Sequence, residues 1–214
     1  MPSGAGGARD RGARVLRDAP GRAGRQHAFA HDSAGAAQAK SNTYKLDPNH
    51  TIVLASWDHF GFSHPVANFG QADGTLVYDP DNVGASSVNV TLPLSGLDAL
   101  VPALTEDLQS DAFFDMAKFP NATFKSTKVE KAGENKLKVT GDLTIRDQTK
   151  PVVLDVTLNK MGEGRNGAPK IGFSATTTIK RSAFGVSKFL PNVADDVEIR
   201  ISTEATVPKD KAAQ

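Results

Sequence analysis

Three histidines and one aspartate lie within 15 residues of one another, namely His50, Asp58, His59 and His64. Imidazole and carboxylate groups can bind zinc or act as general bases. The set has no His-x-His pair and no helical i,i+4 pair, and His59 and His64 would face opposite ways on one continuous strand. We therefore predict no metal site and no catalytic residue, with His50 and His59 as hydrogen-bonded structural residues. An enzyme that uses His50, His59 or His64 on a small hydrophobic substrate is the alternative.

Other polar residues offer less chemistry. Glu106-Asp107 and Asp195-Asp196 are adjacent pairs, and neighbours on a helix or strand point apart, so neither pair forms an acid and base couple. Ser182 has no nearby histidine and no nucleophile-elbow pattern. The glycines of the loop at 162–169 do not have the phosphate-binding spacing that leads into a helix. These residues are interpreted as solvated surface.

Apolar side chains are the better candidates for a binding site. Several aromatic residues fall on the apolar phase of strands or in the irregular, aromatic-rich stretch 58–70, which we interpret as a lip at a barrel mouth. Arg181 ends a long apolar strand, where it could bind a polar head group or cap backbone carbonyls, and we favour the structural role. The predicted ligand-binding residues are Trp57, Phe60, Phe62, Phe69, Phe113, Phe114, Phe124, Leu143, Ile145, Phe173, Ala175, Arg181 and Phe184.

These residues would be positioned by strands, because most of the chain after residue 120 alternates apolar and polar residues with a period of two. Several long antiparallel strands with one apolar face predict an all-β fold, a single antiparallel barrel of about eight strands. A barrel of this size is just wide enough either to fill with side chains or to hold one ligand. Small residues on the inward phase indicate free space, and they are Gly141, Ala175, Thr177, Thr203 and Ala205.

One helical insertion is expected near residues 96–118. Ser95 precedes Asp98 by three residues, as in an N-cap, and apolar residues recur at helical spacing from Leu97 to Leu108. This pattern predicts a helix over 96–109, followed by a shorter helical turn that Pro120 ends. Such an insertion would suit a lid at one end of the barrel.

Composition and charge exclude several classes of protein. The 214-residue chain is 39% hydrophobic and 23% charged, it has no cysteine, and no stretch approaches the length of a membrane-spanning helix. Residues 1–40 carry seven basic and three acidic groups, whereas the remainder carries 18 basic and 21 acidic groups. The main domain therefore has no positive field, and we expect no nucleic-acid partner and no stable membrane insertion.

The first 40 residues are rich in Ala, Gly and Arg and contain few large apolar groups, so we predict that they are disordered. Ala37-Gln38-Ala39 has the pattern of a signal-peptide cleavage site, but the apolar segment that should precede it is missing. Two explanations stand side by side: a start site assigned upstream of the true mature protein, or a plain flexible extension. The barrel domain is expected over 41–208, with a frayed tail at 209–214.

Six blocks in order resemble the YceI-like family of lipocalin-like proteins that bind polyisoprenoid lipids, over about residues 43–207. The chain has Asp147 where the family usually has glycine, and Thr51 where serine is common. The blocks are YKLDPNHT, WDHFGFSHPVANFG, GTLVYDP, DAFFDMAKFPNATFKST, GDLTIRDQTKPV, and GFSATTTIKRSAFGVSKF with DDVEIRI.

The resemblance implies a non-enzymatic carrier or store for a long isoprenoid lipid, either a polyprenyl chain or a quinone, with no other cofactor. It also implies a periplasmic location, and a homodimer is kept open. Burial of hydrocarbon contributes about 0.8 kcal/mol per CH₂, so a diffuse apolar lining would bind a tail without any sharp motif. A third alternative is an interaction protein whose barrel is filled with side chains and whose outer face, rich in Thr and Lys, recognises a partner.

Overall fold

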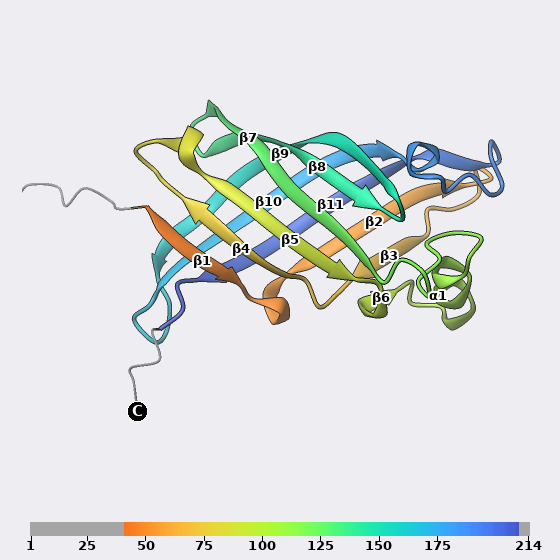
Figure 1. The fold of residues 1–214 in the computed structure, drawn as a ribbon, viewed down its shortest axis with the longest axis horizontal. Coiled ribbons are helices and arrows are strands. Elements are labelled where there is room, and N and C mark those ends of the chain that lie inside the picture. The colour runs from red at the N-terminus through yellow and green to blue at the C-terminus, as the bar shows by residue number, and fades with distance from the viewer. Residues whose placement is uncertain (1–40, 210–214) are drawn as a thin grey trace, which may run out of the picture. The chain divides into compact units, whose positions relative to one another are not determined.

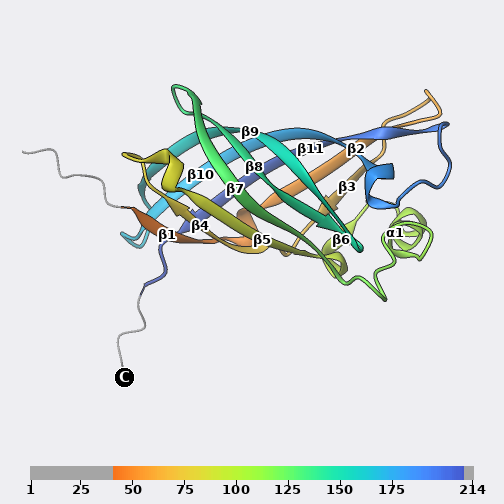
Figure 2. The ribbon, with the colours of Figure 1, turned by 45° about the horizontal axis from the view of Figure 1, so that its top comes forward.

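The alternating segments of the sequence form long antiparallel strands in a computed structural model, which describes residues 41–209 (Figures 1 and 2). On β10, for example, Ile171, Phe173 and Ala175 are buried, whereas Thr176 and Thr178 are exposed. The strands are β1 (Asn42–Leu46), β2 (Ile52–His59), β3 (Val66–Phe69), β4 (Asp73–Tyr78), β5 (Ser87–Pro93), β6 (Leu97–Asp98), β7 (Asn121–Gly133), β8 (Lys136–Ile145), β9 (Gln148–Glu163), β10 (Pro169–Lys180) and β11 (Val193–Thr206).

Eight of these strands close into a ring, which confirms the predicted antiparallel barrel. The order is β1-β4-β5-β7-β8-β9-β10-β11, and β11 pairs back to β1 through Lys45 opposite Thr206 and Leu46 opposite Ala205. Because closure leaves no free edge between these strands, the backbone groups of the wall are satisfied within the sheet. The inward-facing residues of every strand therefore surround one lumen.

Three strands extend the wall at one end of the barrel. After the 3₁₀ turn Pro48–His50, β2 takes over from β1 along β11, so that β11 pairs with both strands. Next to β2, β3 pairs with β2, and the two-residue strand β6 pairs with β3. We refer to this end, where α1 also lies in Figures 1 and 2, as the α1 end of the barrel.

The helical insertion is present, but it begins later than predicted. Helix α1 spans Pro102–Gln109, and turns follow at 111–119, where a shorter helical turn was expected. Ser95 lies instead in the 3₁₀ turn Leu94–Gly96, and Leu97 pairs with Phe69 in β6. Proline at the first helical position has no N–H group to leave unpaired, so Pro102 starts the helix without a side-chain cap.

Buried apolar residues form two main clusters, one toward each end of the barrel. The cluster toward β1 includes Tyr44, Tyr78 and Phe173, and the cluster toward α1 includes Phe69 and Leu108. The rings of Tyr78 and Phe173 meet edge to face with centroids 5.8 Å apart. Within residues 41–209, no helix has the length and apolar character needed to cross a lipid bilayer.

Candidate functional site

Two apolar cavities lie inside the barrel. The cavity near the α1 end has a volume of about 230 Å³, and the second cavity, toward β1, has a volume of about 180 Å³. Each exceeds the roughly 150 Å³ of an engineered apolar cavity that stays dry and binds benzene. The lumen is therefore hollow, in contrast to the alternative of a barrel filled with side chains.

The two cavities share part of their lining. Four apolar residues contact both spaces, and they come from four different strands of the wall: Val53, Leu92, Leu143 and Ile199. These residues lie where the two cavities adjoin, and we call them the constriction residues. A hydrocarbon chain that occupies both cavities would pass between these four side chains.

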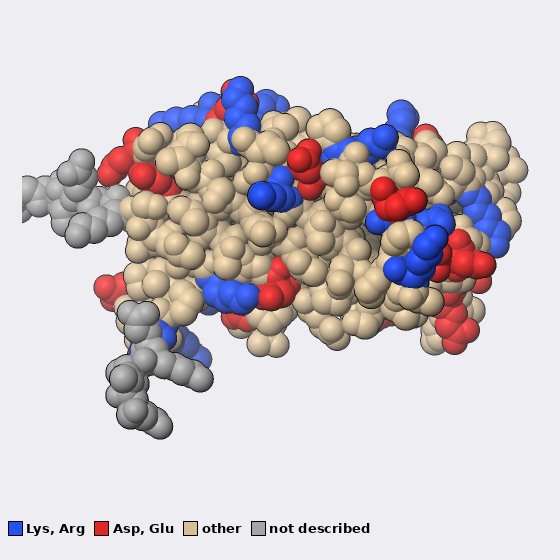
Figure 3. All heavy atoms as spheres, in the orientation of Figure 1, with Lys and Arg blue, Asp and Glu red and all other residues tan. Residues whose placement is uncertain are grey.

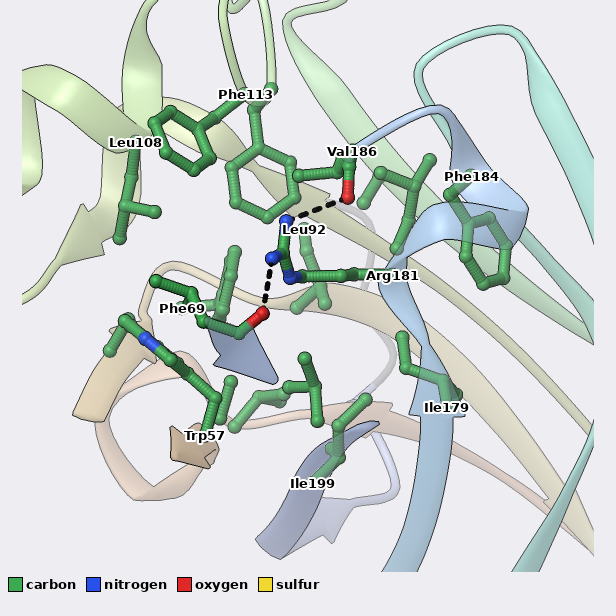
Figure 4. Close-up of a pocket in the computed structure, with 18 of the residues that line it drawn as sticks. Trp57, Phe69, Leu92, Leu108, Phe113, Ile179, Arg181, Phe184, Val186 and Ile199 are labelled. Carbon is green, nitrogen blue, oxygen red and sulfur yellow. Dashed lines mark hydrogen bonds between the residues drawn. The ribbon is translucent and has the colours of Figure 1, made fainter. Parts of the chain in front are cut away.

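Most of the predicted binding residues line these cavities. The α1-end cavity contacts Trp57, Phe69, Phe113, Phe114, Leu143, Ile145, Arg181 and Phe184, several of which are labelled in Figure 4. The second cavity contacts Phe124, Leu143, Phe173 and Ala175. These side chains come from segments far apart in the sequence: most lie on strands of the barrel, Phe113 and Phe114 lie in the turns after α1, and Arg181 and Phe184 lie in the 3₁₀ turn Arg181–Phe184 after β10.

Phe60 and Phe62 are the exceptions, because they lie outside both cavities. They occupy the tight turn between β2 and β3, where the Phe62 amide donates to the His59 carbonyl at 3.0 Å. Phe62 is 90% exposed and Phe60 is 46% exposed. The stretch 58–70 was interpreted as irregular, but β2 runs to His59 and β3 begins at Val66, so the lip is a hairpin.

Gly141 does not leave the free space that its small size suggested. A Cβ atom at this position would lie 2.4 Å from Cζ of Phe124 and 2.6 Å from the Lys125 carbonyl oxygen. The Phe124 ring, on the neighbouring strand β7, therefore packs over the glycine and fills the space that a side chain would occupy. Glycine at this position permits close approach of an aromatic ring to the wall.

Arg181 lies in the α1-end cavity because it continues the inward phase of β10, two residues after Ile179 (Figure 4). Its side chain is 9% exposed, and its three nitrogens donate to the carbonyls of Ala194 (2.8 Å), Val186 (2.9 Å) and Val193 (2.8 Å). These bonds tie the first residues of β11 and the loop before it to the end of β10, as expected for the structural role.

The charge of Arg181 has little direct compensation. Burial lowers the pKa of its guanidinium, and the Asp195 carboxylate opposes this effect. Asp195 itself accepts hydrogen bonds from the Ser182 amide and hydroxyl, both at 2.8 Å. Within the described part of the chain, Arg181 forms no ion pair, so a positive group remains among apolar side chains.

The three histidines do not form one site. His50 is the last residue of the 3₁₀ turn before β2 and His59 ends β2, so the eight residues of that strand separate them by about 25 Å. His59 is exposed but contacts the α1-end cavity, whereas His64 lies on the exposed hairpin. The structure therefore does not bring these histidines together into the shared catalytic centre of the rival hypothesis.

His50 belongs to a polar cluster that sequence reasoning did not identify. Its Nδ1 lies 2.7 Å from Oδ2 of Asp47, and ligand atoms of Asp47, His50 and Glu204 lie within 4.8 Å of one another. The hydrogen bond to His50 is the main cause that lowers the pKa of Asp47. Lys170 forms an ion pair with Glu204, however, so a cation already compensates one of the two carboxylates of this cluster.

The remaining lining residues were missed because their signal is diffuse. Val53 and Ala55 alternate correctly in β2, but the apolar residues on its other phase, such as Ile52, obscured which face is inward. Leu108 and Leu104 line the α1-end cavity from the helix, and their spacing could have shown that the helix packs against the lumen.

A closed eight-stranded antiparallel barrel with apolar cavities in its lumen belongs to the lipocalin-like class of barrels. The sequence profile described as the YceI-like domain matches residues 44–205, which is most of the chain. The protein therefore belongs to the YceI-like family.

Known relatives agree with this assignment. Protein YceI of Salmonella arizonae is 36% identical over 183 residues, which cover 85% of this chain and 93% of that protein. The crystal structure of Burkholderia cenocepacia BcnA superposes with a TM-score of 0.69 at 28% identity, over 75% of this chain and 99% of that one. A polyisoprenoid binding domain from Saccharophagus degradans has the same fold, with a TM-score of 0.61 at 13% identity, over 77% of this chain and 98% of that domain.

Proposed function

We propose that the barrel binds the hydrocarbon chain of an isoprenoid lipid, a polyprenyl chain or a quinone, and carries or stores it without chemical conversion. The observation that carries this proposal is the pair of apolar cavities that share the constriction residues inside the ring. The membership of the YceI-like family supports it, as does the shared fold of a domain described as polyisoprenoid binding. The family resemblance also supports a periplasmic location.

The energy of binding would come from burial of the tail. A tail of about ten carbons gains roughly 8 kcal/mol before the cost of association is subtracted. Because the lining is mostly apolar, the barrel would select ligands by length and width more than by head group. Such selection needs no catalytic residue.

Arg181 would orient the head group at the α1 end. A guanidinium has five N–H bonds, and three hydrogen bonds to carbonyls leave the others available to an oxygen of a ligand. A quinone carbonyl or a phosphate oxygen would suit this position. The tail would then extend past the constriction residues toward the second cavity.

Binding can be tested with purified protein and a matched pair of variants. Ala175 lines the second cavity, so Ala175→Phe adds a ring inside the lumen, whereas Thr176→Phe adds the same ring on the exposed outer face of β10. We expect lipid extracted from the protein, identified by mass spectrometry, and uptake of a polyprenol or quinone to fall at least tenfold in Ala175→Phe only. Native protein that yields no lipid and takes up no prenyl chain would refute the proposal.

A further inference from the structure

Exposed apolar side chains gather at the α1 end of the barrel. Phe60 and Phe62 lie on the β2–β3 hairpin, Phe189 is 54% exposed on the loop before β11, and Leu100 is 71% exposed just before α1. Figures 1 and 2 show these loops together at one end of the ribbon. Large apolar groups collected at one end of a barrel indicate an interaction surface.

The two loops are joined to one another. The Phe60 amide donates to the Asn192 carbonyl at 2.9 Å, and the ring of Phe189 lies 6.3 Å from that of Phe113. The ammonium group of Lys188 lies 5.0 Å from the ring centre of Phe189. We refer to Phe60, Phe62, Phe113 and Phe189 as the aromatic rim.

Backbone conformation gives independent evidence that these exposed apolar side chains have a function. Phe60, Leu100 and Phe189 have φ values of 57°, 64° and 65°, in the left-handed region. Bulky residues rarely adopt this conformation, and glycine or asparagine would suit it better. Turns selected for stability alone would not place large apolar residues at three such positions, which points to a functional constraint on the side chains.

The rim is continuous with the α1-end cavity. Phe113 and Phe189 both line the cavity, and Phe189 is also exposed at the surface, so apolar surface leads from the lumen to the outside. A lipid that leaves or enters by this route would meet water only at the rim.

We propose that the aromatic rim docks on the surface of a lipid bilayer, so that a lipid passes between the bilayer and the lumen. Aromatic rings with a neighbouring lysine are suited to the boundary between head groups and acyl chains. The identity of the transferred lipid rests on the proposed function, whereas the docking on the bilayer does not. Docking would be reversible, because a few rings bury little apolar surface.

Charge favours apolar insertion over attraction to anionic lipids. Helix α1 exposes Glu106 and Asp107, Asp111 follows it, and Figure 3 shows acidic groups over this region. Lys188 is close to the rim, but it does not make this end positive. We therefore expect docking on uncharged, zwitterionic lipid, with little dependence on salt.

The test uses the full chain stripped of bound lipid and vesicles of pure phosphatidylcholine. The variant Phe62→Ser with Phe189→Ser removes two rings of the rim, and Val153→Ser removes a 45% exposed apolar residue from β9 as the control. We expect co-sedimentation with vesicles to fall about tenfold or more per lost ring, with no change in the control. Phe62→Trp with Phe189→Trp should restore it, and added salt should leave it unchanged. An unaltered far-UV circular dichroism spectrum, with the β signal of the native barrel, would show that each variant is folded.

Three results would overturn the docking proposal: no binding of the native chain to vesicles, equal binding by the native chain and the serine variant, or binding that requires anionic lipid. If the rim is instead a contact between two copies of this chain, sedimentation would show a dimer that the serine variant dissociates, without vesicle binding. Failure of the proposed function can be distinguished from failure of docking. A chain that binds vesicles but takes up no prenyl lipid would refute the proposed function and would leave the docking proposal intact.

Discussion

Replacement of Arg181 by methionine should destabilise the barrel by about 2–4 kcal/mol. Three carbonyls of the loop and of β11 lose their charged donor, and each unsatisfied buried group costs about 1–3 kcal/mol. The buried guanidinium itself carries a desolvation cost of several kcal/mol, and its removal offsets part of this loss. Arg181→Lys should be intermediate, because an ammonium group cannot reach all three carbonyls in the geometry of the planar fork.

Urea denaturation monitored by tryptophan fluorescence measures this effect. Trp57 is the sole tryptophan, and it lines the same cavity as Arg181, so its emission should report both unfolding and loosening of the loop before β11. A change in the free energy of unfolding below about 0.5 kcal/mol, the range of ordinary surface substitutions, would refute the structural role. If stability is unchanged while affinity for a quinone or polyprenyl phosphate falls, Arg181 acts on the head group alone.

Three further variants test other parts of the barrel. Gly141→Ala should cost about 1–3 kcal/mol in urea denaturation, since its Cβ would meet the Phe124 ring and nearby backbone; unchanged stability would contradict this packing. Burial opposes the charge of Asp195, but hydrogen bonds from Ser182 prevail and hold the pKa of that carboxyl below its usual 3.8. The stability it contributes is thus present above about pH 4 and is lost as pH falls through the lowered pKa, so Asp195→Asn should differ from the native chain at pH 6 and converge with it in strong acid; a gap that persists in acid would argue against this linkage. Leu92→Ala should join the two cavities, at a cost of about 2–3 kcal/mol, and should let longer or bulkier lipids bind in competition assays; an unaltered preference would show that Leu92 does not limit the lumen.

The wall of the barrel could be predicted from the sequence because alternation is a local property. In β8 and β10 the inward phase matches the buried residues, and the ring follows from several such strands in a row. The start of α1 could not be predicted from capping residues alone, because Ser95 and Asp98 satisfy a cap pattern while Leu97 gains a strand partner in Phe69. Long-range pairing overrode the local signal.

The sequence predicted which kinds of side chain line the candidate site better than it predicted where each of them lies. Phe60 and Phe62 were predicted to bind the ligand as part of the lip, yet both are exposed on the tight turn at Gly61 and lie outside both cavities. The space at Gly141 could not be judged, since its occupant, Phe124, comes from the neighbouring strand. Hydrogen bonds such as those of Arg181 depend on carbonyls of a loop whose path no local pattern fixes.

Because β11 pairs with β10, β1 and β2, the final strand of the chain completes the ring. During synthesis, a chain that ends before Val193 leaves β10 with an open edge and leaves β1 and β2 without their pairing to β11. Such an intermediate exposes apolar surface and unpaired backbone groups, which favour aggregation. Closure also joins segments about 160 residues apart, a loop of high contact order that slows folding. Protection of the nascent barrel by chaperones would therefore matter most just before β11, with its 14 residues, has been synthesised.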